Sequence, residues 1–186
     1  MELIYLQSIV VDDLARLVGE RLRAARQERD LSVGALAAAA HVGKGSLSEI
    51  ENGVRNPTLG TLYALAGALG VPLATLIADR LGTSIVSPGI EVRLLDVSDD
   101  GVQTVEVYRL RIEPGTGHRS PAHGPGVIEH MLVTGGRVRA GRIGEETEIG
   151  TGQAAQWVSD TTHTYTALGD APAECVLVIR SPRSRA

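Results

Sequence analysis

Residues 41–53 read HVGKGSLSEIENG, a stretch in which small and polar residues surround two apolar ones, Leu47 and Ile50. These two lie three positions apart, so a helix carries both on one face. The Asn-Gly pair at the end tolerates the left-handed backbone that terminates helices. The pattern predicts a short helix over residues 44–51, anchored on one side and displaying small polar side chains on the other.

The flanking residues are also typical of helices, from residue 12 to residue 79. Ser32 and Thr58 are good N-caps because their hydroxyl oxygens accept the unpaired N–H groups of a first helical turn. Pro72 suits the first turn of a last helix. An apolar stripe at helical spacing precedes the quoted stretch: Leu14, Leu17, Val18, Leu22 and Ala25. We expect five short helices around one apolar centre.

Residues 31–71, LSVGALAAAAHVGKGSLSEIENGVRNPTLGTLYALAGALGV, resemble the helix-turn-helix domains of the phage-repressor-like XRE family. The resemblance covers about residues 14–78 and implies that residues 44–51 form a recognition helix in the major groove of double-stranded DNA. It also implies an ion pair between Arg26 and Glu51. The candidate DNA-binding residues are Lys44, Gly45, Ser46, Ser48, Glu49, Asn52, Arg55 and Asn56.

Each candidate has a chemical reason. Lys44 can reach a guanine edge or a phosphate, and Glu49 can accept from a cytosine amine, although it is equally typical of a solvated helix surface. The serines can bond to phosphate or base, and Asn52, Arg55 and Asn56 would hold the DNA backbone. The family's customary glutamine after Ser32 is a valine here, which removes one expected phosphate contact.

The second half changes to short β-type runs separated by Gly and Pro, which suggests an antiparallel sandwich or barrel. We predict a linker over residues 80–88 and a second domain over residues 89–182. The expected strands are residues 90–97, 102–112, 127–133, 137–142, 153–158, 163–167 and 173–180. The fold class is therefore α+β with two domains, a five-helix domain followed by a β domain.

Two stretches of the second half, PGTGHRSPAHGPGVIEHMLVTGGRVRAG (residues 114–141) and GTGQAAQWVSDTTHTYTALGDAPAECVLVI (residues 150–179), resemble the two signature motifs of the cupin family. The resemblance implies an antiparallel β-barrel, the double-stranded β-helix. Cupin metal ions are usually held by three histidines and a glutamate. Here His123, Glu129 and His163 match, whereas Pro121 stands where the first metal histidine is expected.

The three matching residues permit two interpretations, which the sequence leaves open. They can form a two-histidine, one-carboxylate face for one divalent ion such as iron or zinc. They can equally line an effector cavity without metal. Strand alternation adds Met131 and Tyr165 to the same cavity, so the candidate effector-binding residues are His123, Glu129, Met131, His163 and Tyr165. His118 is a possible substitute ligand, and Trp157 is more typical of a core.

Composition narrows the classes of protein. The net charge is −4, so no global basic field indicates nucleic acid binding, and that prediction depends on local geometry. A single cysteine excludes an internal disulfide framework. The longest uncharged run is broken by Gly and Pro, so we expect no membrane span, and the acidic start lacks a secretory signal. These features favour a cytoplasmic protein.

We therefore predict a sequence-specific DNA-binding transcriptional regulator whose cupin domain binds a small-molecule effector and forms a homodimer. An alternative is a non-haem-iron cupin oxygenase, because a fosfomycin-type epoxidase combines a similar helical domain with an iron cupin. The longer gap between His123 and Glu129 argues against it. A binding module that has lost DNA contact is a third possibility. The sequence does not identify the effector, the operator or the direction of regulation.

Overall fold

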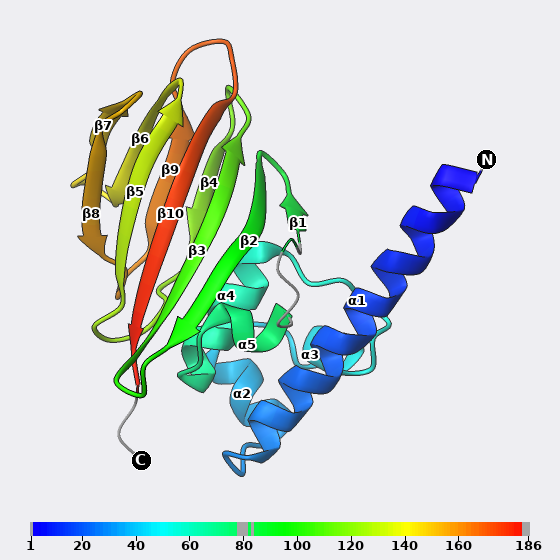
Figure 1. The fold of residues 1–186 in the computed structure, drawn as a ribbon. Helices are drawn as coiled ribbons and strands as arrows, with labels where there is room; N and C mark the ends of the chain where they lie inside the picture. The colour runs from blue at the N-terminus through cyan, green and yellow to red at the C-terminus, as the bar shows by residue number, and fades with distance from the viewer. Residues whose placement is uncertain (1, 78–81, 83, 184–186) are drawn as a thin grey trace. The chain divides into compact units, whose positions relative to one another are not determined.

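The structure is a computed structural model that describes residues 2–77, 82 and 84–183, with side chains from Ala15 onward. The chain divides into two compact units, residues 1–78 and 79–186. The described helices lie in the first unit, the helical unit, and the described strands lie in the second, the β unit (Figure 1).

The helical unit contains α1 (Glu2–Gln27), α2 (Val33–Ala39), α3 (Lys44–Glu51), α4 (Leu59–Leu69) and α5 (Leu73–Ile77). The bounds of α3 agree with the prediction, whereas α1 begins well before residue 12. None of the helices in the described residues is long and apolar enough to cross a membrane.

Capping residues set the helix starts as predicted. The Ser32 hydroxyl accepts a hydrogen bond from the Ala35 N–H at 3.0 Å, and the Thr58 hydroxyl accepts one from the Thr61 N–H at 3.2 Å. Between α2 and α3, His41 adopts a left-handed backbone with φ of 54°. Histidine adopts this region more readily than most residues, so it can form the turn.

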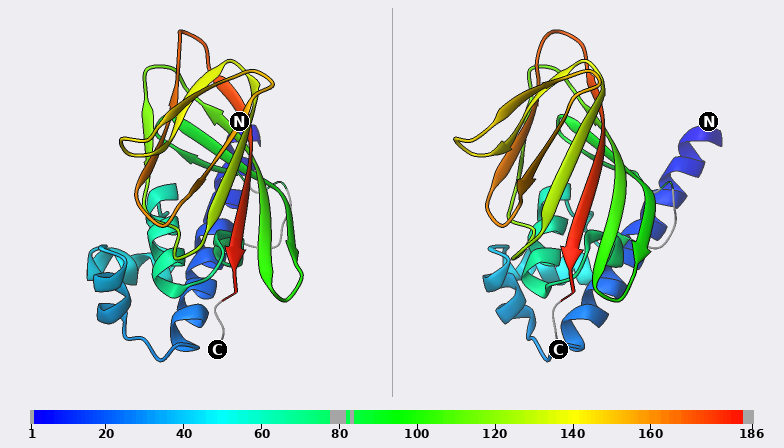
Figure 2. Two further views of the ribbon diagram at one scale, coloured as in Figure 1. Left: turned by 90° about the vertical axis from the view of Figure 1, so that its left-hand side faces the viewer. Right: turned by 60° about the vertical axis from the view of Figure 1, so that its left-hand side comes forward.

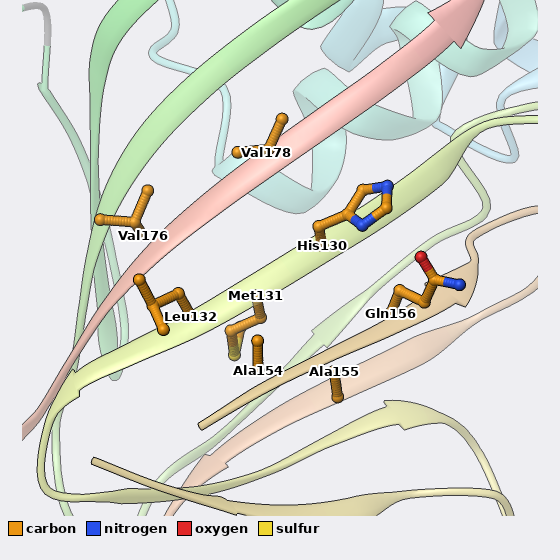
Figure 3. Close-up of a pocket in the computed structure, with 8 residues that line it drawn as sticks. All are labelled: His130, Met131, Leu132, Ala154, Ala155, Gln156, Val176 and Val178. Atoms are coloured by element: carbon orange, nitrogen blue, oxygen red, sulfur yellow. The ribbon is translucent and has the colours of Figure 1, made fainter. Parts of the chain in front are cut away.

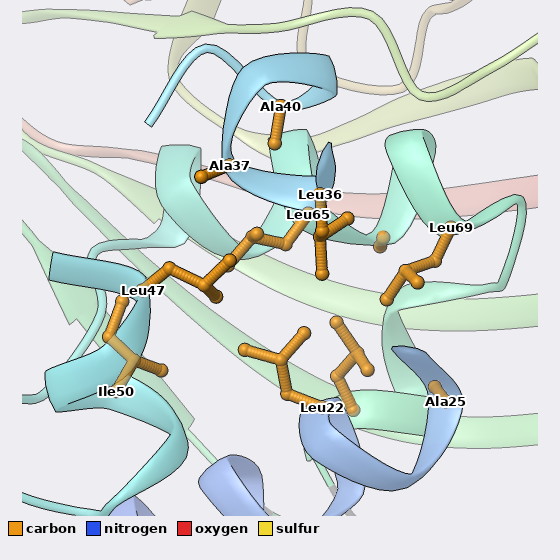
Figure 4. Close-up of a cluster of buried hydrophobic side chains, with 11 residues drawn as sticks. Leu22, Ala25, Leu36, Ala37, Ala40, Leu47, Ile50, Leu65 and Leu69 are labelled. Carbon is orange, nitrogen blue, oxygen red and sulfur yellow. The ribbon is translucent and has the colours of Figure 1, made fainter. Parts of the chain in front are cut away.

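The core of the helical unit draws on all five helices (Figure 4). Its buried residues are Leu22, Ala25, Leu36, Ala37, Ala40, Leu47, Ile50, Leu65, Ala66, Leu69 and Leu76. Leu47 and Ile50 are almost fully buried. Because both anchor the same face of α3, the opposite face is turned to solvent.

Helices α1 and α3 approach closely at Gly19. A Cβ atom built on Gly19 would lie 2.3 Å from the carbonyl oxygen of Ile50, much closer than any real contact. Any side chain here would push α3 away from α1, so the glycine allows the two helices to pack.

The β unit consists of two antiparallel sheets, seen from two further sides in Figure 2. One sheet has the order β1 (Ser84–Ser87), β2 (Ile90–Asp99), β3 (Gln103–Ile112), β10 (Ala173–Pro182), β5 (Ile128–Gly135) and β8 (Ala154–Val158). The other has the order β4 (Gly117–Ser120), β9 (His163–Ala167), β6 (Arg137–Arg142) and β7 (Thr147–Gly150).

Three of these strands were not predicted, and the expected closed barrel is not formed by the described residues. Strand β1 lies inside the expected linker, whose residues 80, 81 and 83 fall outside the described chain. Strands β4 and β7 are four residues long, and β4 contains a glycine. Such short segments read as loops because their extended form comes from pairing with β9 and β6, not from their own pattern.

We expect Gly19→Ala to lower the free energy of unfolding of the helical unit by about 1–3 kcal/mol, because the added methyl group overlaps the α3 backbone. Gly45→Ala is the matched control: Gly45 is also helical, but an added Cβ meets nothing within 4 Å. That change should raise stability by up to about 1 kcal/mol through helix propensity. Urea unfolding of both variants measures the effect, and equal effects would contradict the close packing of α1 and α3.

Candidate functional site

The outward face of α3 is exposed and polar. Lys44, Gly45, Ser48 and Glu49 are exposed, and Ser46 is half-buried. After the helix, Asn52, Arg55 and Asn56 are exposed as well. The predicted DNA-binding residues therefore form one continuous accessible stretch, with Lys44 at the N-terminal end of the helix.

A buried ion pair fixes the inner side of α3. The Arg26 guanidinium donates from Nε to Glu51 Oε1 at 2.6 Å and from Nη2 to Glu51 Oε2 at 2.9 Å. Its Nη1 donates to the Leu31 carbonyl oxygen at 2.8 Å. The Glu51 side chain is only 3% exposed. This two-bond contact sets the direction of α3 relative to α1, as the family resemblance implied.

Four of the predicted DNA-binding residues already have side-chain partners within the unit: Arg55 contacts both Ser46 and Glu49, and Asn52 contacts Arg23. The Asn52 amide accepts from Arg23 at 2.6 Å and donates to the Ser48 carbonyl oxygen at 2.8 Å, so it helps to end α3. Sequence reasoning did not identify Arg23. Arg55 donates to Glu49 at 3.2 Å, but both side chains are more than half exposed. Exposed pairs contribute little, so Arg55 can exchange Glu49 for a phosphate.

In the β unit, four predicted effector-binding residues meet at one buried place between the two sheets. Glu129 comes from β5 of the larger sheet, and His163 and Tyr165 come from β9 of the smaller one. His123 lies in the loop between β4 and β5. One ligand atom each from His123, Glu129 and His163 lies within 4.8 Å of the other two, and all three side chains are at most 5% exposed.

Hydrogen bonds define the protonation of this cluster. His163 Nδ1 lies 2.9 Å from the Thr161 carbonyl oxygen, which can only accept, so Nδ1 carries a proton. When the ring is neutral, the lone pair of Nε2 therefore points inward. That nitrogen lies 3.0 Å from Tyr165 Oη and 3.1 Å from Glu129 Oε1. Tyr165 donates its hydroxyl proton to Glu129 Oε2 at 2.5 Å.

The backbone holds His123 in place despite the glycines that follow it. Its N–H donates to the Ser159 carbonyl oxygen at 2.8 Å, and its Nε2 lies 3.0 Å from the Ser120 hydroxyl. Its Nδ1 lies 2.8 Å from Glu129 Oε1. The loop therefore presents a fixed imidazole, although Gly124 and Gly126 follow it.

Burial and charge shift the pKa values of the cluster in different directions. Burial would raise the pKa of Glu129, but the neighbouring His123 and His163 outweigh it and lower that pKa. Burial lowers the pKa of His123. For His163 burial also opposes the charged form, yet the adjoining Glu129 carboxylate raises its pKa overall. The site thus keeps an ionised carboxylate at neutral pH.

Glu129 Oε1 is the chemically informative atom. Two imidazole nitrogens lie within 3.1 Å of it, yet within the described part of the chain it accepts no well-directed hydrogen bond. A buried carboxylate oxygen in this condition is costly unless a cation or proton compensates it. Two nitrogens and one carboxylate oxygen are also a preferred ligand set of divalent iron and similar ions, so these residues fit a metal ion.

Comparison with known proteins matches this chain to transcriptional regulators. The helix-turn-helix family model HTH_3 matches residues 22–76. The chain is 40% identical over 65 residues to an uncharacterised HTH-type transcriptional regulator, y4dJ of Sinorhizobium fredii, covering 35% of this chain and 84% of the relative. The chain belongs to the XRE-type helix-turn-helix transcriptional regulators.

Two full-length matches extend the likeness of this XRE-family chain beyond the helices. The HTH-type transcriptional regulator SutR of Escherichia coli K12 is 29% identical over 178 residues, which cover 94% of this chain and all of the relative. The crystal structure of an HTH_3 family transcriptional regulator from Vibrio cholerae is 24% identical with a TM-score of 0.83, covering 93% of this chain and 99% of that one. The latter likeness shows the fold.

Around the cluster, this XRE-family regulator carries aromatic and apolar side chains. Met131 is buried on the same face of β5 as Glu129. The His118 ring stacks on Tyr165, with ring centres 6.0 Å apart, and the Trp157 ring centre lies 6.0 Å from that of Tyr165. Among the described residues, His118 Nε2 and Trp157 Nε1 are buried without a hydrogen bond. Trp157 was expected to be a plain core residue, but it also places its indole N–H beside the cluster.

The regulator also has a shallow depression of about 390 Å³ on its six-stranded sheet, away from the cluster (Figure 3). Most of its lining side chains alternate with the buried ones and so lie on the outer face of the sheet. The lining residues are His130, Met131, Leu132, Ala154, Ala155, Gln156, Val176 and Val178. This depression is mainly apolar and does not contain the His123, Glu129 and His163 ligand atoms.

His118 provides a prediction on pH. Burial, together with the nearby His163 and His123, lowers its pKa to about 4, against a smaller opposing effect of Glu129. In the unfolded chain histidine titrates near about 6.5. As the pH falls, the unfolded state therefore binds the His118 proton first. This residue leaves the free energy of unfolding unchanged above about pH 6.5 and reduces it progressively towards pH 4.

His118→Phe keeps a ring beside Tyr165 but cannot titrate. We expect the difference in unfolding free energy, wild type minus variant, to be constant above pH 7 and to decrease as the pH falls from about 6.5. Urea unfolding across pH measures it, and a difference that stays flat or rises would show that His118 is not held neutral.

Proposed function

We propose that this regulator binds operator DNA as a homodimer in the cytoplasm, and that its β unit binds a small-molecule effector at the buried cluster. The observation that carries the first part is the two-sided character of α3. One side is fixed by Leu47, Ile50 and the Arg26–Glu51 pair, and the other is polar and exposed. A short helix held in this way can enter the major groove.

Within this proposal, Lys44 at the start of α3 reaches a base edge or a phosphate, and Ser46, Ser48 and Glu49 contact bases or phosphates. Gly45 permits close approach. Arg55 and Asn56 hold the DNA backbone, while Asn52 contributes mainly by ending the helix. One such helix reads few bases, so two copies with α3 helices about 34 Å apart would give useful specificity.

For the β unit we propose one divalent ion held by His123, Glu129 and His163. Such an ion acts as a Lewis acid that binds an oxygen atom of the effector. Met131 and Trp157 then shape the cavity. The buried Trp157 N–H supplies a donor for a polar effector, and His118 Nε2 can supply a second in the tautomer that protonates it. The ligand class that suits this site is a small carboxylate or another oxygen-rich anion.

A non-haem-iron oxygenase is the second candidate, favoured by the two-histidine, one-carboxylate set itself. The two functions separate on turnover. Repeated conversion of small acids or phosphonates with ferrous iron and oxygen, lost in Glu129→Ala, would support the enzyme. Thermal stabilisation by such a compound without turnover would support the sensor.

For DNA binding, we expect Lys44→Ala to weaken binding to a selected operator by about 1–3 kcal/mol while affecting unrelated DNA less, because Lys44 reads a base edge. Arg55→Ala should weaken all sequences similarly and reduce the salt dependence, because it contacts phosphate. Arg93→Ala removes the same charge from the β unit and is the control. Fluorescence anisotropy at several salt concentrations measures all three, and wild-type affinity in both Lys44→Ala and Arg55→Ala would refute the assignment.

For the metal, we expect purified protein reconstituted with Fe²⁺ or Zn²⁺ to retain one ion per chain after desalting. Glu129→Gln and His163→Gln should lose it because each removes a ligand, while the helical unit keeps its DNA affinity since it has its own core. Glu106→Gln is the matched control, because Glu106 is likewise buried and accepts a tyrosine hydroxyl. Equal metal content in all three variants would exclude this site.

A further inference from the structure

We infer that Tyr165 is a fourth ligand of the metal ion, binding through its phenolate oxygen in place of the histidine that Pro121 replaces. This inference rests on the metal site proposed above. It assigns Tyr165 a role different from contact with the effector. The donor set would then be two imidazole nitrogens, one carboxylate and one phenolate.

The spacing of the donor atoms is the first argument. Ligand atoms about 2.1 Å from an ion lie about 3.0 Å apart at right angles and about 3.4 Å apart in a tetrahedron. Tyr165 Oη lies 3.0 Å from His163 Nε2 and 2.5 Å from Glu129 Oε2. Glu129 Oε1 lies 3.1 Å from His163 Nε2 and 2.8 Å from His123 Nδ1. The phenol oxygen thus lies as close to His163 Nε2 and to the Glu129 carboxylate as the two imidazole nitrogens lie to that carboxylate.

The surroundings of the ring are the second argument. Tyr165 follows His163 by two positions on β9, so both side chains lie on the same face. Its ring is 2% exposed. It stacks on His118 and meets the His163 ring edge-on, with centres 5.5 Å apart. Trp157 packs on it as well. These contacts hold the hydroxyl at the cluster.

Charge balance is the third argument. With a protonated phenol, a divalent ion and the Glu129 carboxylate leave one uncompensated positive charge in a fully buried site. Phenolate removes it, which avoids the cost of burying net charge. On binding, the phenol O–H bond breaks, an oxygen–metal bond forms, and the proton leaves to solvent. No electrons are transferred, and the ion takes the place of the proton now shared with Glu129.

Ferric iron gives a direct test, because iron(III) bound to phenolate has a charge-transfer band in the visible range that imidazole and carboxylate ligands do not produce. We would load the full-length protein with Fe²⁺, oxidise it, desalt it, and measure iron content and the visible spectrum together. Wild type should be coloured. Tyr165→Phe should lose the band while still binding iron through the other three ligands.

Tyr108→Phe is the matched control, since Tyr108 is a second buried tyrosine whose hydroxyl donates to a glutamate, Glu106, at 2.8 Å. It should keep both iron and colour. Resonance Raman spectra of the wild type, excited in the band, should show tyrosinate vibrations and need no variant to fold. Bound iron without the band or these vibrations would overturn the ligand role of Tyr165 and leave the three-residue site intact. Failure of the wild type to bind iron or zinc would instead refute the proposed metal site, and the Tyr165 inference with it.

Discussion

A carboxylate with no exposure to solvent needs a proton, a cation or several hydrogen bonds, and in the β unit this constraint falls on Glu129. It is met by side chains from both sheets and from the β4–β5 loop. Tyr165 donates to one oxygen, while His123 and His163 approach the other. The two histidines are themselves held by further contacts, His123 to Ser120 and Ser159 and His163 to Thr161.

The helical unit compensates a buried carboxylate in a different way. The difference distinguishes a structural ion pair from a candidate ligand site. Glu51 is also buried, but it meets the guanidinium of Arg26 through two parallel hydrogen bonds. Arginine stays charged at every relevant pH, so that pair is complete and serves to orient α3. The imidazoles beside Glu129 can give up protons and offer lone pairs. Only the second arrangement leaves a place for an exogenous ion.

Sequence periodicity and capping chemistry predicted much of the fold. The bounds of α3, the caps Ser32 and Thr58, and strands β6 and β9 depend on neighbours in the sequence, so local patterns reveal them. Strands β4 and β7 depend on pairing with distant strands and did not show in their own residues. The early start of α1 was missed because the apolar stripe was traced only from Leu14.

The candidate site was also predicted only in part, because local patterns do not show contacts between distant segments. Motif positions identified His123, Glu129 and His163, and alternation placed Tyr165 on the face of His163. Alternation cannot show that Tyr165 reaches Glu129, because the two residues lie 36 positions apart on different sheets. The fixed position of His123 likewise comes from a backbone bond to Ser159, which the glycine-rich loop concealed.

We propose that occupancy of the buried site of the β unit changes DNA binding by α3. The most direct measurement is the Kd of the full-length protein for a selected operator, metal-loaded and metal-free, with and without a stabilising small acid. We expect Kd to differ between these states by about 5-fold or more, and operator DNA to change the affinity for the acid by the same factor, since coupling between sites is reciprocal. Identical Kd values in all states, with the site shown to be occupied, would contradict it.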